Sequence, residues 1–269
     1  MRPAPTTILQ LDGVSLRYDT TPSVLHGINL KLNAGSFHFL SGPTGAGKTS
    51  LLRLISLSLP PTSGSIRVFG REIDKINRDE LAGLRQRIGV VFQDLRLLEH
   101  LSAFDNVALP LRINGADEDE TVKFVADMLG WLGLGDKLEA LPAGLSMGQR
   151  QMVAIARAIV GRPRLLLADE PTSNIDAANA ARLMSLFVQL HKLGATVVLA
   201  THSETLMDRY PYPVLRMAAG RLSMPAVQPA ADRDRPAMEV EPDGGDLDDD
   251  RLEPEEAQEP STVQKAKRG

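Results

Sequence analysis

Hydrophobic positions along the chain follow two different periods. Apolar and polar residues alternate over residues 8–16 and again over 28–32, which predicts strands at these positions. Further strand-like runs cover residues 37–40, 65–69, 88–92, 164–168 and 196–200, and a short strand pair is expected near 214–222. Because strands that alternate with helices form a parallel sheet with helices on its faces, the pattern predicts an α/β fold.

Helical spacing separates most of these runs. One helix is expected to begin at Lys48, and others are expected to cover residues 149–160, 177–193 and 204–209. Between about residues 95 and 163 the chain becomes helical in character. Within this block, apolar residues fall on one face of a predicted helix, namely Val122, Val125, Met128, Leu129 and Leu132. We interpret the block as a helical subdomain inserted into a domain that spans residues 1–222.

The end of the chain differs in composition from the rest. From Leu222 onward there are 13 acidic and 6 basic residues, whereas the preceding part has 21 acidic and 24 basic residues. Six prolines and the run Asp248–Asp250 lie in this acidic segment, which holds few apolar residues. Such a composition is typical of disorder, so residues 223–269 are expected to form an acidic, proline-rich tail.

Composition also bears on where the chain works. With 43% hydrophobic and 24% charged residues, it is typical of a globular protein. No stretch approaches the roughly 18 apolar residues that cross a bilayer, and the first residues lack the apolar core of a secretion signal. We therefore expect a cytoplasmic protein. The absence of cysteine excludes disulfides and thiolate metal sites.

Residues 42–49, which we call the phosphate loop, carry the clearest chemical signal. Gly-Pro-Thr-Gly-Ala-Gly-Lys-Thr fits the pattern G-x-x-x-x-G-K-[ST], and it stands after a predicted strand and opens a predicted helix. Backbone N–H groups of such a loop surround a phosphate, and the helix N-terminus adds a positive dipole. Lys48 is expected to reach the β- and γ-phosphates, and Thr49 to place its hydroxyl on Mg²⁺. The alternative is a glycine-rich turn that matches by chance, which the strand-to-helix context disfavours.

The nucleotide-binding residues expected from this loop are contiguous in the sequence. They are Gly42, Pro43, Thr44, Gly45, Ala46, Gly47, Lys48, Thr49 and Ser50.

A second motif places two acids, Asp169 and Glu170, directly after the apolar run 165–168. Since α/β sheets bind ligands at the carboxyl ends of their strands, Asp169 suits Mg²⁺ coordination and Glu170 suits a general base for water. The two acids could instead cap a following helix, with Pro171 in its first turn.

Five motifs follow one another in a characteristic order. After the phosphate loop come Gln93 behind a strand, Ser146-Met147-Gly148-Gln149 at a helix start, Asp169-Glu170, and His202 behind a strand. Ser146 by itself is an ordinary helix N-cap. In this order, the motifs resemble the ABC ATPase family over about residues 6–223. The resemblance implies a P-loop NTPase (RecA-like) core with an N-terminal antiparallel β subdomain and an inserted α-helical subdomain. It also implies ATP and Mg²⁺ as cofactors, ATP hydrolysis to ADP and phosphate, and an ATP-dependent head-to-tail homodimer.

The resemblance assigns roles to individual positions. Tyr18 is similar to the aromatic residue that stacks on adenine, although a tyrosine in an edge strand is otherwise unremarkable. Gln93 is similar to the glutamine that senses Mg²⁺ and the attacking water, and that links the site to a membrane partner. Asp176 is similar to the acid that crosses the dimer interface, and His202 to the histidine that contacts the γ-phosphate. We call residues 145–149 the signature segment. Its Ser146 and Gly148 are similar to the residues that contact the γ-phosphate bound to the opposite subunit, and Gln149 is expected to be a further nucleotide-binding residue.

One position departs from the family pattern. The usual signature has glycine where this chain has Met147. Glycine permits close approach of the backbone to a phosphate, whereas methionine adds bulk beside it. Because Ser146 and Gly148 are retained, the departure bears on the rate of turnover more than on the mechanism.

A finer resemblance is to the cell-division branch of the family. It rests on residues 88–98 and 105–111, and above all on Asp94 directly after Gln93. This branch works with an integral membrane protein and transmits force to cell-wall hydrolases, which implies a location on the inner face of the membrane through that partner. Related ATPases for lipoprotein release or macrolide export remain the alternative.

The apolar segment after Gln93 allows two interpretations. Leu95, Leu97 and Leu98 are either part of a groove that receives a short helix of the membrane partner, or simply buried.

Other classes of ABC ATPase fit the sequence less well. A DNA-acting member would carry a long coiled coil between the phosphate loop and the signature, but only 96 residues separate Lys48 from Leu145, without sustained heptads. A ribosome-acting member would carry two cassettes. The near-neutral charge before the tail lacks the basic stripe expected for nucleic-acid binding. A non-catalytic scaffold is disfavoured because Lys48, Glu170 and His202 are all present.

Overall fold

The computed structural model describes residues 6–19, 23–173 and 175–223, so the expected tail lies outside the described residues except for its first position. The described part contains an antiparallel sheet in the order β2-β1-β4-β5. Its strands are β1 (Thr7–Leu16), β2 (Leu25–Asn33), β4 (Ser63–Val68) and β5 (Arg71–Glu72). Every pairing in this sheet is antiparallel, as expected for the N-terminal β subdomain.

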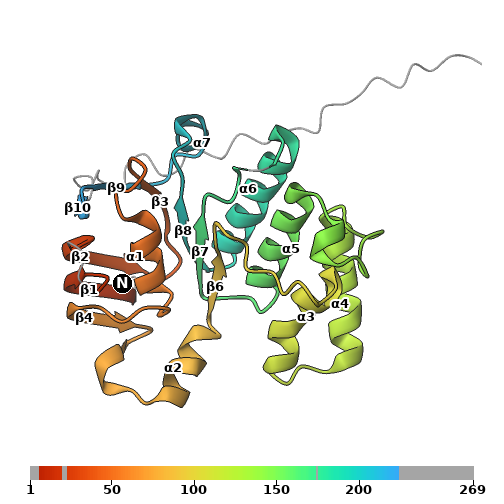
Figure 1. Cartoon of the computed structure of the whole chain (residues 1–269), viewed down its shortest axis with the longest axis horizontal. Coiled ribbons are helices and arrows are strands. Elements are labelled where there is room, and N and C mark those ends of the chain that lie inside the picture. Colours follow the sequence, from red (N-terminus) through yellow and green to blue (C-terminus); the bar gives the residue numbers. More distant parts are fainter. Residues whose placement is uncertain (1–5, 20–22, 174, 224–269) are drawn as a thin grey trace, which may run out of the picture. The chain divides into compact units, whose positions relative to one another are not determined.

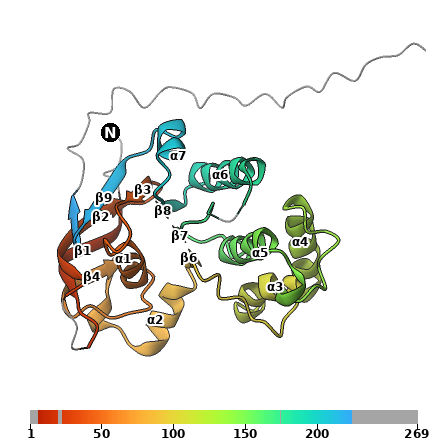
Figure 2. The same ribbon diagram turned by 45° about the horizontal axis from the view of Figure 1, so that its top comes forward.

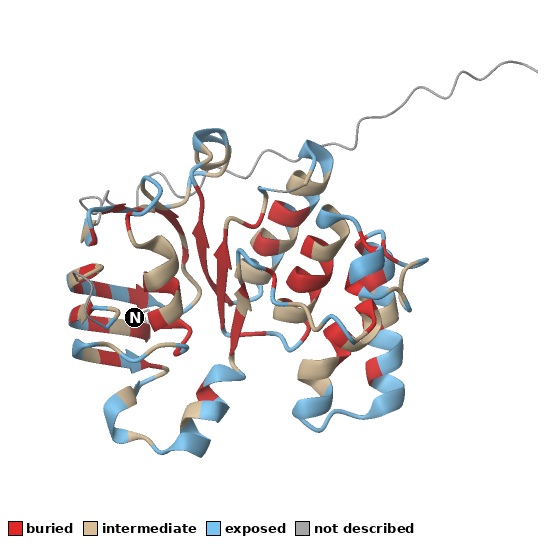
Figure 3. Ribbon diagram, viewed as in Figure 1, coloured by how far each residue is buried: buried red, intermediate tan, exposed pale blue. Residues whose placement is uncertain are grey.

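A second, larger sheet forms the centre of the α/β core and has the order β10-β9-β3-β8-β7-β6. Its strands are β3 (Phe37–Ser41), β6 (Ile88–Val91), β7 (Leu165–Asp169), β8 (Thr196–Ala200), β9 (Val214–Ala218) and β10 (Arg221–Ser223). All pairings are parallel except that of β9 with β10. Every residue of β7 and β8 is buried, which is typical of parallel strands covered on both faces (Figure 3).

Helices cover the parallel sheet and build a separate helical block. Figure 1 shows their arrangement. They are α1 (Lys48–Ile55), α2 (Arg78–Arg85), α3 (Ala103–Ile113), α4 (Glu118–Trp131), α5 (Met147–Ile159), α6 (Ala177–Lys192) and α7 (Glu204–Arg209), with short 3₁₀ turns at Ile73–Lys75 and Pro142–Gly144. The expected helices are present, and the short α2 was not predicted. No helix in the described ranges has the length and apolar character needed to cross a membrane.

Three groups of buried side chains hold these layers together. The first joins α1 and the antiparallel sheet to one face of the parallel sheet. The second packs α6 and part of α5 on the opposite face, and the third joins α3, α4 and α5. Helix α5 therefore contributes to two cores, through Ile155 and Ile159 to one and through Met152, Val153 and Ala156 to the other. It lies between α6 and the α3–α4 pair in both ribbon views (Figure 1 and Figure 2).

Local sequence explains where the helices of the block begin. The side chains of Ser102 and Asp117 accept hydrogen bonds from the first-turn amides of α3 and α4, which satisfies donors that have no partner inside the helix. The predicted buried face of α4 is confirmed for Val125 and Leu129, but Val122 is 46% exposed. Thr121 is buried in its place, and its hydroxyl donates to the Asp117 carbonyl at 2.7 Å. The buried face thus differs from the predicted one at its first position, where Thr121 replaces Val122.

The packing of α5 on the parallel sheet depends on a glycine. A side-chain carbon at Gly89, in β6, would lie 2.2 Å from the carbonyl oxygen of Ala158 in α5.

We expect Gly89→Ala to lower the free energy of unfolding by about 1–3 kcal/mol, because α5 must move away from the sheet. The control is Gly83→Ala in α2, where the added carbon meets no atom within 4 Å. It should be neutral, or raise stability by up to about 1 kcal/mol through helix propensity. Thermal unfolding of both variants tests this, and equal stability of the two would contradict the packing.

Candidate active site

The phosphate loop leads from β3 into α1 and has a backbone that requires glycine. Gly47, at the N-cap of α1, has φ of 100°, a left-handed conformation that side chains disfavour. A side-chain carbon at Gly42 would lie 2.2 Å from the carbonyl oxygen of Met217 in β9. Lys48 folds back over the loop, and its Nζ donates to the Gly42 carbonyl at 2.7 Å and to the Pro43 carbonyl at 3.2 Å. The helix N-terminus and this ammonium group together form a site suited to a phosphate.

The end of β7 brings an acid to the first turn of α1. The Thr49 hydroxyl donates to Asp169 Oδ2 at 2.6 Å, across 120 residues of sequence. Asp169 is only 4% exposed, and burial raises the pKa of its carboxyl, while the hydrogen bond from Thr49 lowers it. A buried carboxylate beside a hydroxyl offers the hard oxygen ligands that Mg²⁺ prefers.

Glu170 is held in an unusual conformation next to His202. Its φ is 51°, which costs a non-glycine residue about 1–3 kcal/mol and is found most often at functional sites. The Glu170 amide donates to the Ala200 carbonyl at 2.9 Å, and its carboxylate Oε1 lies 2.8 Å from His202 Nδ1. Its side chain is 12% exposed, whereas that of His202 is 75% exposed. The two predicted catalytic groups, from the ends of β7 and β8, therefore meet.

The alternative interpretation of these acids as a helix cap is wrong. Helix α6 begins at Ala177, and its N-cap is Asp176. The Asp176 carboxylate accepts from the Asn179 amide at 2.9 Å and from the Asn179 side chain at 2.7 Å. These bonds hold the pKa of Asp176 below its usual value.

A cavity of about 260 Å³ joins the three predicted metal ligands, Thr49, Gln93 and Asp169. Its other lining residues are Arg53, Phe92 and Asp94. Gln93 follows β6 and is exposed, so its amide can turn toward the cavity. The carboxyl ends of β6 and β7 thus bring an amide, a carboxylate and a hydroxyl to one place.

The segment after Gln93 has features that the sequence analysis missed. Leu95 and Arg96 are consecutive non-glycine residues with φ of 54° and 50°. The Arg96 guanidinium lies 3.9 Å from the centroid of the Phe92 ring and 3.1 Å from both carboxylate oxygens of Asp94. Arg157, in α5, donates to the carbonyls of Leu95 and Arg96 at 2.8 Å each. No local signal in the sequence marks Arg157, because its partners lie 61 and 62 residues away.

Tyr18, the predicted adenine-stacking residue, lies near the phosphate loop. Its hydroxyl is 3.2 Å from the Ser50 hydroxyl in α1, and its ring packs against the first core. The structure thus brings Tyr18 and Ser50, both predicted to bind nucleotide, to one side of the loop.

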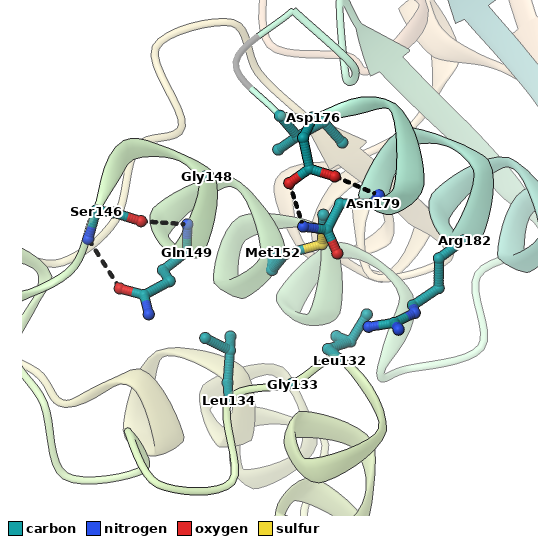
Figure 4. A pocket seen from close by; sticks show the side chains of 11 residues that line it. Leu132, Gly133, Leu134, Ser146, Gly148, Gln149, Met152, Asp176, Asn179 and Arg182 are labelled. Atoms are coloured by element: carbon teal, nitrogen blue, oxygen red, sulfur yellow. Dashed lines mark hydrogen bonds between the residues drawn. The ribbon is translucent and has the colours of Figure 1, made fainter. Parts of the chain in front are cut away.

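The signature segment lines a different cavity, of about 460 Å³ (Figure 4). Ser146 and Gln149 form a capping box: the Ser146 hydroxyl accepts from the Gln149 amide at 3.2 Å, and Gln149 Oε1 accepts from the Ser146 amide at 2.9 Å. Residues from three elements surround the cavity. They are Leu132, Gly133, Leu134, Ser146, Gly148, Gln149, Met152, Ile175, Asp176, Asn179 and Arg182. Met147 is not among them, and 54% of its surface is exposed.

The predicted site residues that line these two cavities fall into two groups. Thr49, Gln93 and Asp169 line one cavity, and the signature residues with Asp176 line the other. Neither cavity is lined by residues of both groups.

Comparison with known proteins finds a family model, sequence relatives and a solved structure that match this chain. The family model described as "ABC transporter" matches residues 25–173. The cell division ATP-binding protein FtsE of Mycobacterium tuberculosis is 40% identical over 216 residues, which cover 80% of this chain and 94% of that protein. FtsE of Escherichia coli K12 is 39% identical over 215 residues, 80% of this chain and 97% of that protein. A dimeric post-hydrolysis structure of the ATP-binding cassette MJ0796 bound to ADP and Pi has a TM-score of 0.76 at 31% identity, and the match covers 80% of this chain and 97% of that one.

These matches extend over the phosphate loop, the signature segment and the acids after β7. They agree with the P-loop core, the antiparallel subdomain and the helical block found in the structure. The chain belongs to the ABC transporter ATP-binding family, and it binds and hydrolyses ATP.

Proposed function

We propose that two copies of the chain form an ATP-dependent homodimer with two shared sites. The supporting observation is that the signature residues line a different cavity from Thr49, Gln93 and Asp169, the predicted metal ligands of the same chain. In a head-to-tail dimer, Ser146, Gly148 and Gln149 of one copy would face the γ-phosphate bound to the other. The structural relative bound to ADP and Pi is itself dimeric.

In each shared site we assign roles from the resemblance to the family, together with the contacts of these residues. The phosphate loop, including Lys48, holds the phosphates, and Tyr18 stacks on adenine. Glu170 accepts a proton from the attacking water, while His202, 2.8 Å from Glu170, orients this carboxylate and contacts the γ-phosphate. Asp176 belongs to the surface that the second copy covers.

The oxygen donors of Thr49, Asp169 and Gln93 fit Mg²⁺, whose ligands in proteins are oxygens. The ion would neutralise charge that develops on the phosphates during hydrolysis. The hydrogen bond between Thr49 and Asp169 keeps two of these ligands aligned before the ion binds.

The biological setting we propose is cell division. The FtsE relatives match over four fifths of the chain, and the notable Asp94 follows Gln93. The partner would be an FtsX-like integral membrane protein that regulates cell-wall hydrolysis, and the chain would be cytoplasmic, on the inner face of the membrane. We propose no nucleic acid as a partner of this chain. In this proposal residues 1–222 form the ATPase domain, with a helical subdomain at about 95–163 and a tail at 223–269. An ATPase for lipoprotein release or macrolide export is the alternative.

The segment after Gln93 can serve as part of the docking surface for this partner. Of its three leucines, Leu95 is buried and Leu97 packs against the core of the helical block. Leu98 is half-buried and does not belong to any of the three cores. The interpretation that these leucines are simply buried therefore holds for Leu95 and in large part for Leu97, and the docking proposal rests on Leu98.

The role of Glu170 is tested by Glu170→Gln. The variant should bind ATP normally, lose about 10²–10⁴-fold in turnover and accumulate as an ATP-bound dimer, because the general base is removed while the site is kept. Phosphate release and light scattering measure the two effects. Glu204→Gln, an exposed acid in α7, is the control and should behave like the parent. Near-normal turnover of Glu170→Gln would refute the assignment.

The Mg²⁺ site is tested by Thr49→Val, which keeps the size of the side chain but removes its hydroxyl. The Mg²⁺ concentration at half-maximal hydrolysis should rise by about tenfold or more, because a ligand and the donor to Asp169 are both lost. Thr49→Ser retains the hydroxyl and should stay close to the parent. If Val and Ser give the same Mg²⁺ dependence, Thr49 is not a ligand.

The partner is tested by purifying the tagged chain from detergent-solubilised membranes of its own cells. Mass spectrometry should identify an FtsX-like protein, and Leu98→Asp should remove it because a charge enters the apolar contact. Leu193→Asp, at a leucine that is 84% exposed, is the control and should retain it. Both variants should bind ATP. Recovery of a lipoprotein-release permease instead would favour the alternative, and normal recovery with Leu98→Asp would remove Leu98 from the docking surface.

A further inference from the structure

Helix α5 touches the segments that follow strands β7 and β6. It begins next to Ser146 in the signature segment. In its second turn the buried Gln151 donates to the Pro171 carbonyl at 3.1 Å, directly after Glu170. Near its end Arg157 donates to the carbonyls of Leu95 and Arg96, two and three residues after Gln93. One helix thus contacts the surroundings of Ser146, Glu170 and Gln93.

The contact made by Arg157 is unusual for an arginine. Burial lowers the pKa of its guanidinium, and within the described ranges no carboxylate lies at ion-pair distance from it. Its donors are directed instead at two main-chain carbonyls, with a longer contact of 3.4 Å to Asn106 Oδ1. Those carbonyls belong to Leu95 and Arg96, the two residues with left-handed backbone. A largely desolvated charge whose two short hydrogen bonds both go to the backbone can hold a strained segment in one conformation.

Asn106 continues this arrangement along the chain. It is fully buried in α3, and its side-chain amide donates to the carbonyls of Leu98, Leu101 and Ser102. Its Oδ1 accepts from the Leu98 amide at 2.9 Å. Residues 95–102 are therefore bound to α5 and α3 by two side chains. Gln93 and Asp94, just before this segment, are exposed.

We infer that Arg157 is a positioning residue for Gln93, through which the signature helix of a chain sets the glutamine of that chain's own nucleotide site. Arg157 lies eleven residues after Ser146, about 16 Å along a helix that behaves as a rigid rod. When the partner's nucleotide displaces the signature segment, α5 carries Leu95 and Arg96 with it. Gln93, two residues before Leu95, must follow. The inference rests on the proposed role of Gln93.

This arrangement connects the two sites of a dimer by a short covalent and hydrogen-bonded path. Ser146 and Gly148 respond to the nucleotide of one site, and Gln93 acts in the other. A purely structural role for Arg157 would instead stabilise the whole helical block. A structural role would make amide exchange faster in all peptides, whereas a positioning role would leave exchange at the phosphate loop and ATP affinity nearly unchanged.

The test uses Arg157→Met and Arg157→Lys in the full chain, with Arg162→Met as matched control. Arg162 follows α5, and its described ring contact is to Phe124 alone. Amide hydrogen exchange is read for peptides covering residues 93–98 and for the phosphate loop. Turnover and ATP affinity are measured on the same samples, with affinity determined without Mg²⁺.

For Arg157→Met we expect exchange over residues 93–98 to become about tenfold faster or more, because two charge-assisted bonds are lost. The phosphate loop should exchange as before, ATP affinity should change by less than about twofold, and turnover should fall about tenfold. Arg157→Lys keeps the charge but cannot span both carbonyls, so it should recover part of the turnover. Arg162→Met should match the parent in all four measurements.

Normal turnover of Arg157→Met would overturn the inference, as would exchange that rises equally in all peptides. If Arg157→Met does not fold, Arg157→Lys decides: unchanged exchange at residues 93–98 and unchanged turnover would overturn it. Gln93→Ala separates this inference from the proposed function. Normal turnover of Gln93→Ala would remove the proposed role of Gln93 itself. Impaired Gln93→Ala together with normal Arg157→Met would remove only the role of Arg157.

Discussion

Helix α5 is packed on two sides at once, and the position of the signature residues at its start depends on this packing. One side lies on the parallel sheet, where Gly89 lets the Ala158 backbone approach β6. The other side lies against α3 and α4. Because well-packed side chains on both sides leave little free volume, the helix cannot shift without moving its neighbours. A displacement of the signature segment at its start is therefore passed on to the elements that pack against α5.

The parallel sheet determines where the predicted catalytic side chains meet. β3, β6, β7 and β8 are neighbours or near neighbours and run in one direction, so the segments that follow them lie at one edge. The phosphate loop, Gln93, Asp169 with Glu170, and His202 each follow one of these strands. Contacts between Thr49 and Asp169, and between Glu170 and His202, connect residues that are far apart in sequence. The edge therefore assembles half of a site from four separate motifs.

Much of this arrangement could be predicted from the sequence, because periodicity and motif spacing are local signals. Alternating strands and helices indicated the α/β core, and Gly42–Thr49 indicated the phosphate loop. The burial of Thr121 in place of Val122 could not be predicted, since both residues can lie in a helix and only packing with α3 and α5 decides between them. The left-handed backbone at Leu95 and Arg96 could not be predicted from the sequence either. Neither residue type favours positive φ, and the donors that stabilise it come from Arg157, in another part of the chain.

The proposed mechanism requires two chains for one complete hydrolytic site. Specific ATPase activity, measured over a wide range of chain concentrations and compared with the mass of the ATP-bound species by light scattering, tests this claim directly. Activity per chain should rise with concentration and level off where the ATP-bound protein is dimeric, because only then does Ser146 of one copy meet the phosphate loop of the other. Constant activity per chain at concentrations where the ATP-bound protein remains monomeric would contradict the account.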